Sequence, residues 1–101
     1  MAADKAFMEK IVEKLAPLGD VKSRVMFGGY GIFYEGNMFA LISGSTLFLK
    51  ADAANLDDFK KAGSKQYKPM PYYEAPVEII NDAGRLREWA KKSIAIPPKK
   101  K

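Results

Sequence analysis

The sequence predicts an α+β domain of two layers, in which one antiparallel sheet is packed by helices. Between Met26 and Asp52, apolar and other residues alternate with a period of two, and two glycine-containing turns interrupt the alternation. The flanking segments each carry one apolar helical stripe, which needs a surface to cover. A single sheet would serve all of these helices, so we expect the order α-β-β-β-β-α-β-α with the helices mainly on one face.

Four successive strands are expected in the first half of the chain. Glu35-Gly36-Asn37 and Ser43-Gly44-Ser45 suit tight hairpin turns, which need a positive φ. They separate strands near residues 30–34, 38–43 and 46–50. An earlier strand has Val21, Val25 and Phe27 on one face and Lys22, Arg24 and Met26 on the other. The residues that we expect in the core are Phe27, Phe39, Leu41, Leu47, Leu49 and Trp89.

Helices are predicted before and after these strands. The first runs over about residues 4–16 and ends at Pro17. Asp52 is the expected N-cap of a helix over 53–62, with Gly63 as its stop. Two prolines within 67–74 leave room only for a short edge strand at 72–74. Pro76 opens a turn at 77–80, and Asp82 caps a last helix over 83–94.

The run Gly28-Gly29-Tyr30-Gly31 has two interpretations. It is either a bend between two strands or a backbone nest that binds a phosphate. The spacing fits neither the dinucleotide fingerprint nor the P-loop, so we favour the bend. We therefore expect Gly29 or Gly31 to have a positive φ or to allow a close backbone approach.

The amino-acid composition excludes several classes of functional site. The chain has 101 residues, which we divide into one domain over 1–96 and a basic tail over 97–101. It contains no cysteine and no histidine, which excludes Cys/His zinc sites and Ser-His triads. No spacing among the remaining polar residues indicates catalysis, so we expect no enzyme, no cofactor and no metal. No export signal or membrane-spanning run is present, and we expect a cytoplasmic location.

The net charge of +5 is concentrated at the C-terminal end. Residues 1–84 hold 10 basic and 11 acidic side chains, a net charge of −1, whereas residues 85–101 hold 7 basic and 1 acidic, a net charge of +6. This asymmetry suggests weak, sequence-independent binding of nucleic acid. The candidate contacts are Arg85, Arg87, Lys91, Lys92, Lys99, Lys100 and Lys101. The alternative is a solvated helix surface with cations near its C-terminus.

The most specific stretch of the sequence is MFGGYGIFYEG over residues 26–36. Together with MFALI over 38–42, LFLKAD over 47–52 and the Glu88-Trp89-Ala90 run, it resembles the N-terminal domain of the TfoX/Sxy family. The resemblance implies a two-layer, secretion-chaperone-like fold and supplies no catalytic residues. The signature residues, to which we assign a structural role, are Met26, Phe27, Gly28, Gly29, Tyr30 and Gly31.

The resemblance also implies a function. Full-length members of the family regulate natural competence, are thought to act with the catabolite regulator protein at promoters, and carry a second helical domain. We expect this chain to be a standalone form of the N-terminal domain and a non-enzymatic regulatory or protein-interaction module. The first alternative is weak nucleic-acid binding through the basic C-terminus, and the second is a small enzyme of unknown class. A protein partner is expected, and a homodimer remains open.

Overall fold

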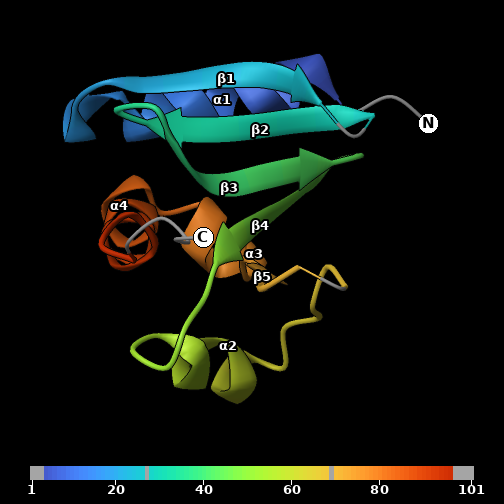
Figure 1. Ribbon diagram of the computed structural model, residues 1–101, viewed down its shortest axis with the longest axis vertical. Helices are drawn as coiled ribbons and strands as arrows, with labels where there is room; N and C mark the ends of the chain where they lie inside the picture. Colours follow the sequence, from blue (N-terminus) through green and yellow to red (C-terminus); the bar gives the residue numbers. More distant parts are fainter. Residues whose placement is uncertain (1–3, 27, 69, 97–101) are drawn as a thin grey trace, which may run out of the picture.

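The computed structural model describes residues 4–26, 28–68 and 70–96, and the chain forms a five-stranded sheet with helices beside it (Figure 1). The strands are β1 (Val21–Met26), β2 (Gly29–Tyr34), β3 (Asn37–Ser43), β4 (Thr46–Lys50) and β5 (Tyr72–Glu74). The helices are α1 (Lys5–Leu15), α2 (Leu56–Ala62), α3 (Val77–Ile80) and α4 (Ala83–Ile94), with a 3-10 turn, η1 (Ala16–Leu18), after α1.

The strands lie in the order β1-β2-β3-β4-β5, and every neighbouring pair is antiparallel. The first four strands form a meander because each is joined to the next by a short connection. β5 joins after α2 and pairs with β4. The predicted fold class, a two-layer α+β arrangement with an antiparallel sheet, is therefore confirmed.

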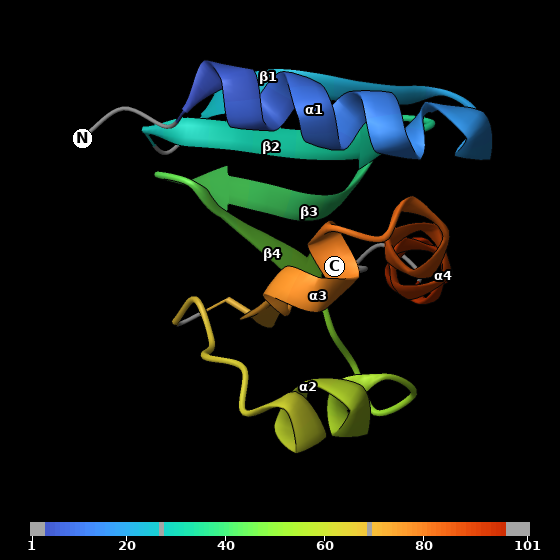
Figure 2. The same ribbon diagram turned by 180° about the vertical axis from the view of Figure 1, so that it is seen from behind.

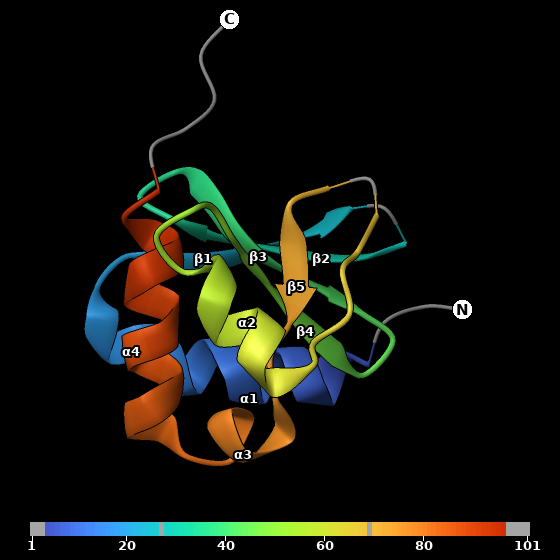
Figure 3. The same cartoon turned by 90° about the horizontal axis from the view of Figure 1, so that it is seen from below.

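The helices lie on one side of the sheet. Seen from behind, α1 runs along β1 and β2, α3 lies in front of one end of β4, and α4 lies beside one end of β3 (Figure 2). Helix α4 contacts both β3 and β4. The view from below shows the same separation into two layers (Figure 3). The core between the layers is apolar and includes Ile11, Leu15, Ile32, Ile42, Leu47, Leu49, Phe59, Ile79 and Leu86, each at most 1% exposed.

Side-chain caps explain where α1 and α4 begin. The Asp4 carboxylate accepts a hydrogen bond from the Phe7 amide at 3.1 Å, and the Asp82 carboxylate accepts one from the Arg85 amide at 3.2 Å. The α-helix α1 ends at Leu15, close to the predicted stop at Pro17. Pro17 itself does not leave the helical path. It lies inside η1, because a proline is tolerated in the first turn of a helical segment.

The predicted start of α2 at residue 53 is wrong, since the helix begins at Leu56. The reason lies in a polar turn. The Asn55 side chain is 2% exposed and accepts a hydrogen bond from the Asp52 amide at 2.8 Å. It also donates to the Lys50 carbonyl at 3.0 Å. These bonds hold residues 52–55 in a turn, and asparagine side chains commonly compete with helical backbone bonding in this way.

The strand faces differ from the prediction in β3. Ala40 pairs with Leu49 and Ile42 pairs with Leu47, so these residues share the helix-covered face. Leu41 pairs with Phe48 on the opposite face, although it is only 3% exposed. A register shift between Ile32 and Phe33 marks a β-bulge.

This bulge explains the mixture of faces within one strand. An extra residue in one strand interrupts the alternation of side chains. Phe39, which sits at the bulge, therefore joins the core beside Ala40. Of the other residues predicted in the core, Trp89 is only partly buried, and Phe27 lies outside the described residues.

The run from Gly28 to Gly31, which we call the glycine corner, is a bend with one close backbone approach. Gly28 has a φ of 71°, whereas Gly29 does not adopt a positive φ. A methyl group on Gly29 would overlap the carbonyl oxygen of Ile42 in β3. Gly29 is therefore where the close approach occurs, and Gly28 is the residue with the positive φ.

Candidate functional site

The face of the sheet that points away from the helices carries an apolar surface. We call it the open face and define it by Met26, Phe33, Met38, Leu41 and Phe48. Four of these five side chains are partly exposed, and Leu41 is buried. An apolar sheet face without helical cover is a recognised sign of an interaction surface.

Gly31 lies at the centre of the open face. A methyl group there would overlap the Met26 sulfur and would lie 3.0 Å from both the Met38 sulfur and the Phe33 ring. The side chains of Met26, Phe33 and Met38, which belong to three neighbouring strands, therefore pack over Gly31. Methionine side chains adapt their shape readily, which suits a surface that accommodates a partner.

The end of the open face near β5 is covered by the chain itself. The Tyr67 ring packs edge-on against Phe48, with 5.1 Å between the ring centroids. Tyr72 is 4% exposed, and its hydroxyl donates a hydrogen bond to the Met38 carbonyl at 3.4 Å. Burial raises the pKa of Tyr72 to about 12, so this hydroxyl stays protonated at physiological pH.

The end of the open face near β1 is exposed and basic. Lys22 and Arg24 alternate along β1 and share the face of Phe33 and Gly31, their cross-strand neighbours. The Arg24 guanidinium lies 5.7 Å from the centroid of the Phe33 ring, a cation–π distance. A pocket of about 330 Å³ opens here, lined by Asp20, Lys22, Ser23, Arg24, Phe33 and Gly36.

The basic residues that we singled out on α4 do not form one patch. The Arg87 side chain donates a hydrogen bond to the Lys14 carbonyl of α1 at 3.2 Å. Lys92 forms an ion pair with Asp58 of α2 at 2.8 Å. Arg85 and Lys91 are exposed, but they are six positions apart in the sequence, which places them about 120° apart around the helix.

Two of the four therefore contact neighbouring helices. Lys99, Lys100 and Lys101 lie outside the described residues. Weak nucleic-acid binding through this end of the chain stays a prediction.

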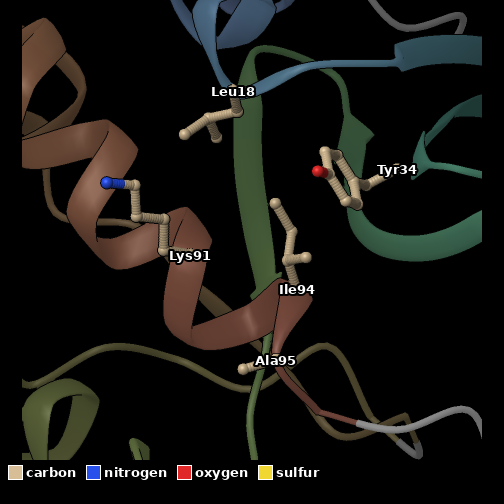
Figure 4. Close-up of a pocket in the computed structure, with 5 residues that line it drawn as sticks. All are labelled: Leu18, Tyr34, Lys91, Ile94 and Ala95. Atoms are coloured by element: carbon tan, nitrogen blue, oxygen red, sulfur yellow. The ribbon is translucent and has the colours of Figure 1, made fainter.

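A second pocket, of about 210 Å³, lies between the end of α4 and the start of the sheet. Ile94 projects between Leu18 and Tyr34, and Lys91 and Ala95 complete the lining (Figure 4). Of the described residues that line this pocket, Lys91 is the one cation and none is a carboxylate. Among the described residues, no group of histidine, cysteine or acidic side chains is arranged to hold a metal ion.

The six signature residues fall at the junction of β1 and β2. Met26 ends β1, Gly28 makes the turn, and β2 begins at Gly29, while Phe27 lies outside the described residues. Phe33, Met38 and Phe48 of the open face were not among the predicted site residues. One signal in the sequence could have indicated them. Both faces of these strands are apolar, and a single layer of helices can cover only one face of a sheet.

The protein is thus a small α+β domain. Helices cover one face of its sheet, and the opposite face is apolar and partly basic. The family model described as the TfoX N-terminal domain matches residues 13–96. The chain therefore belongs to the TfoX N-terminal domain family. No curated protein matches the chain in sequence. None of the helices in the described ranges combines the length and apolar character that a membrane crossing needs.

Proposed function

We propose that this protein is a non-enzymatic regulatory module that binds a partner protein through the open face. The observation that carries the proposal is the apolar sheet face formed by Met26, Phe33, Met38 and Phe48, which the helices of the described residues leave uncovered. Burying such a surface against a partner would remove apolar area from water at about 25 cal/mol per Å². We place the protein in the cytoplasm.

The process we propose for it is the regulation of transcription, and within that of natural competence. The support is membership of the TfoX N-terminal domain family together with the competence role that the resemblance implies. A family label alone does not define a function, which must come from a site. The open face supplies that site in the proposal.

Expression of face variants in the native host tests the regulatory role. Met38→Glu puts a charge on the open face, where burial against a partner would be costly. Lys60→Glu, at an exposed position of α2, is the control, and it changes the net charge by one unit more than Met38→Glu does. We expect transcript changes on expression of the wild-type chain and of Lys60→Glu, and their loss with Met38→Glu at an unchanged unfolding midpoint. Equal transcript profiles for all three proteins would contradict the proposal.

Photo-crosslinking locates the contact. A benzophenone amino acid replaces Met38 in one variant and Lys60 in another, and both are irradiated in the living cell. We expect one protein to be joined to the Met38 position and to be lost when Phe33→Glu is added. Crosslinks of equal yield from both positions would place the contact elsewhere.

A further inference from the structure

The two outer strands of the sheet, β1 and β5, differ in the backbone hydrogen bonding of their outer edges. The outer edge of β5 is paired, because the Tyr67 amide donates to the Tyr72 carbonyl at 2.8 Å and the Glu74 amide donates to the Lys65 carbonyl at 2.9 Å. β1 ends the sheet on the other side, and no strand in the described ranges pairs with its outer edge (Figure 1). A six-residue strand with one free edge is a template for another strand.

The hydrogen-bond pattern shows which backbone groups β1 presents outward. The Glu35 amide donates to the Asp20 carbonyl at 3.0 Å, which makes these two residues a hydrogen-bonded antiparallel pair. Because such pairs alternate, Lys22 and Arg24 bond to β2, and the N–H and C=O groups of Ser23 and Val25 point away from the sheet. The Val25 side chain is 79% exposed, which is unusual for a large apolar residue in a strand.

The positive charge along the outer edge of β1 indicates which kind of added strand would bind there. Lys22 and Arg24 are both exposed and stand on the same face, beside the 330 Å³ pocket. The nearby carboxylate of Asp20 is 3.8 Å from the Lys22 amine, and both side chains are more than half exposed. A pair exposed in this way contributes little and leaves the cations available.

In the two registers that pair the most of β1 with a second copy of the chain, like charges lie opposite each other. In an antiparallel pair of two β1 strands, the register centred on Arg24 places two Arg24 side chains opposite each other. The register centred on Ser23 places Lys22 opposite Arg24. Like charges directly opposite each other in a sheet are destabilising. A strand with carboxylates at every second position would instead set each of them opposite a cation.

We propose that β1 accepts an extended acidic segment of a partner protein as a sixth strand of the sheet. Its backbone would bond to Ser23 and Val25, and its alternate carboxylates would face Lys22 and Arg24 at the pocket. Strand addition of this kind takes its affinity from main-chain bonds and its specificity from alternate side chains. The inference rests on the proposed function and names the chemistry of the partner.

A proline substitution separates the edge from the rest of the sheet. Ser23→Pro removes an outward N–H group and leaves the ladder between β1 and β2 intact, since edge strands tolerate proline where the N–H faces solvent. Ser23→Ala keeps the N–H group and is the matched control. The probe is a fluorescent peptide of the repeated unit Glu-Val-Glu-Thr, and fluorescence anisotropy measures its dissociation constant.

We expect wild-type protein and Ser23→Ala to bind the peptide equally and Ser23→Pro to bind about tenfold more weakly, the value of roughly one lost hydrogen bond. If Ser23→Pro does not fold, Val25→Pro tests the second outward N–H group. Unchanged affinity in a folded proline variant would overturn the proposal, as would an absence of peptide binding by the wild-type protein.

Charge reversal tests the specificity. Lys22→Glu with Arg24→Glu should abolish binding of the Glu peptide and create binding of a peptide with lysine at the same positions. Arg85→Glu with Lys91→Glu changes the net charge equally on α4 and should leave both affinities near those of the wild-type protein. A single-stranded oligothymidine bound through Lys22 and Arg24, with an affinity that Ser23→Pro does not change, would show a nucleic-acid surface and overturn the proposal.

These results are independent of the test of the proposed function. Peptide binding through β1 without any transcript change would contradict the regulatory role and leave the edge site standing. Transcript changes that depend on Met38 in a protein that binds no acidic peptide would contradict the edge site alone.

Discussion

The two faces of the sheet are both apolar, yet only one is covered by helices. On the covered face, Ile42 and Leu49 are at most 1% exposed because the helices pack over them. On the open face, Met38 and Phe48 are partly exposed, and the Tyr67 ring packs against Phe48 at one end. The difference shows that an apolar strand sequence does not by itself indicate which face of the sheet forms the core. The face on which the helices pack stabilises the fold, and the other face is free to bind a partner.

The largest expected effect is on the covered face. Leu49→Ala removes a fully buried side chain and should lower the free energy of unfolding by about 2–5 kcal/mol. The partly exposed Met38→Ala on the open face should cost clearly less, because less apolar area is lost. Urea unfolding of both variants measures the contrast. Equal losses would mean that the two faces do not differ in the way described.

The glycine corner sharpens the comparison, because one of its glycines lies against a neighbouring strand. Gly29→Ala would overlap the Ile42 carbonyl and should destabilise the protein by about 1–3 kcal/mol. At Gly28, no atom of the described residues beyond its chain neighbours lies within 4 Å of an added methyl group, and the expected cost comes from its φ of 71°. Calorimetric unfolding of both variants should rank Gly29→Ala below Gly28→Ala in stability. The reverse order would argue against the close approach.

The buried tyrosine of the open face predicts a loss of stability in alkali. The pKa of Tyr72 is raised from 10.0 to about 12, so between these values the unfolded chain releases a proton that the folded protein retains. Stability is therefore unaffected by Tyr72 below pH 10 and falls as the pH rises above it, by about 1 kcal/mol at pH 11. Urea unfolding from pH 8 to 11 should show a weaker pH dependence for Tyr72→Phe. Identical pH profiles would mean that the hydroxyl is not buried.

The smallest expected effect is at the surface ion pair between α2 and α4. Lys92→Ala removes the 2.8 Å contact with Asp58 and should cost below about 1 kcal/mol, because the pair is solvated and screened by salt. Chemical unfolding at low and high salt measures the effect, which should shrink as salt is added. A loss as large as that of Leu49→Ala would show that this pair, and not apolar packing, holds α2 in place.

The sequence was sufficient for the order of the elements and for most of their bounds. The period of two, the cap at Asp82 and the two hairpin turns are local signals, and local signals predict elements well. The start of α2 was missed because it depends on a buried Asn55 side chain that bonds back to Asp52 and Lys50. Local bonds between a side chain and the backbone leave no trace in the hydrophobic period.

The candidate site was harder to predict, for a related reason. The bulge in β3 moves Phe39 into the core and turns Leu41 to the open face, which a regular alternation cannot anticipate. The basic residues of α4 drew attention by composition, although Arg87 and Lys92 are engaged within the chain. Lys22 and Arg24 were placed on one face of their strand from the sequence, but only the sheet order shows that this strand is an edge.

Hydrogen exchange at single amides of β1 tests the central claim most directly. The account predicts slow exchange at Lys22 and Arg24, whose amides bond to β2, and fast exchange at Ser23 and Val25, whose amides face outward. Addition of the acidic peptide should slow exchange at Ser23 and Val25 alone. Slow exchange at these two amides in the free protein, independent of the peptide, would mean that the edge is already paired and would contradict the account.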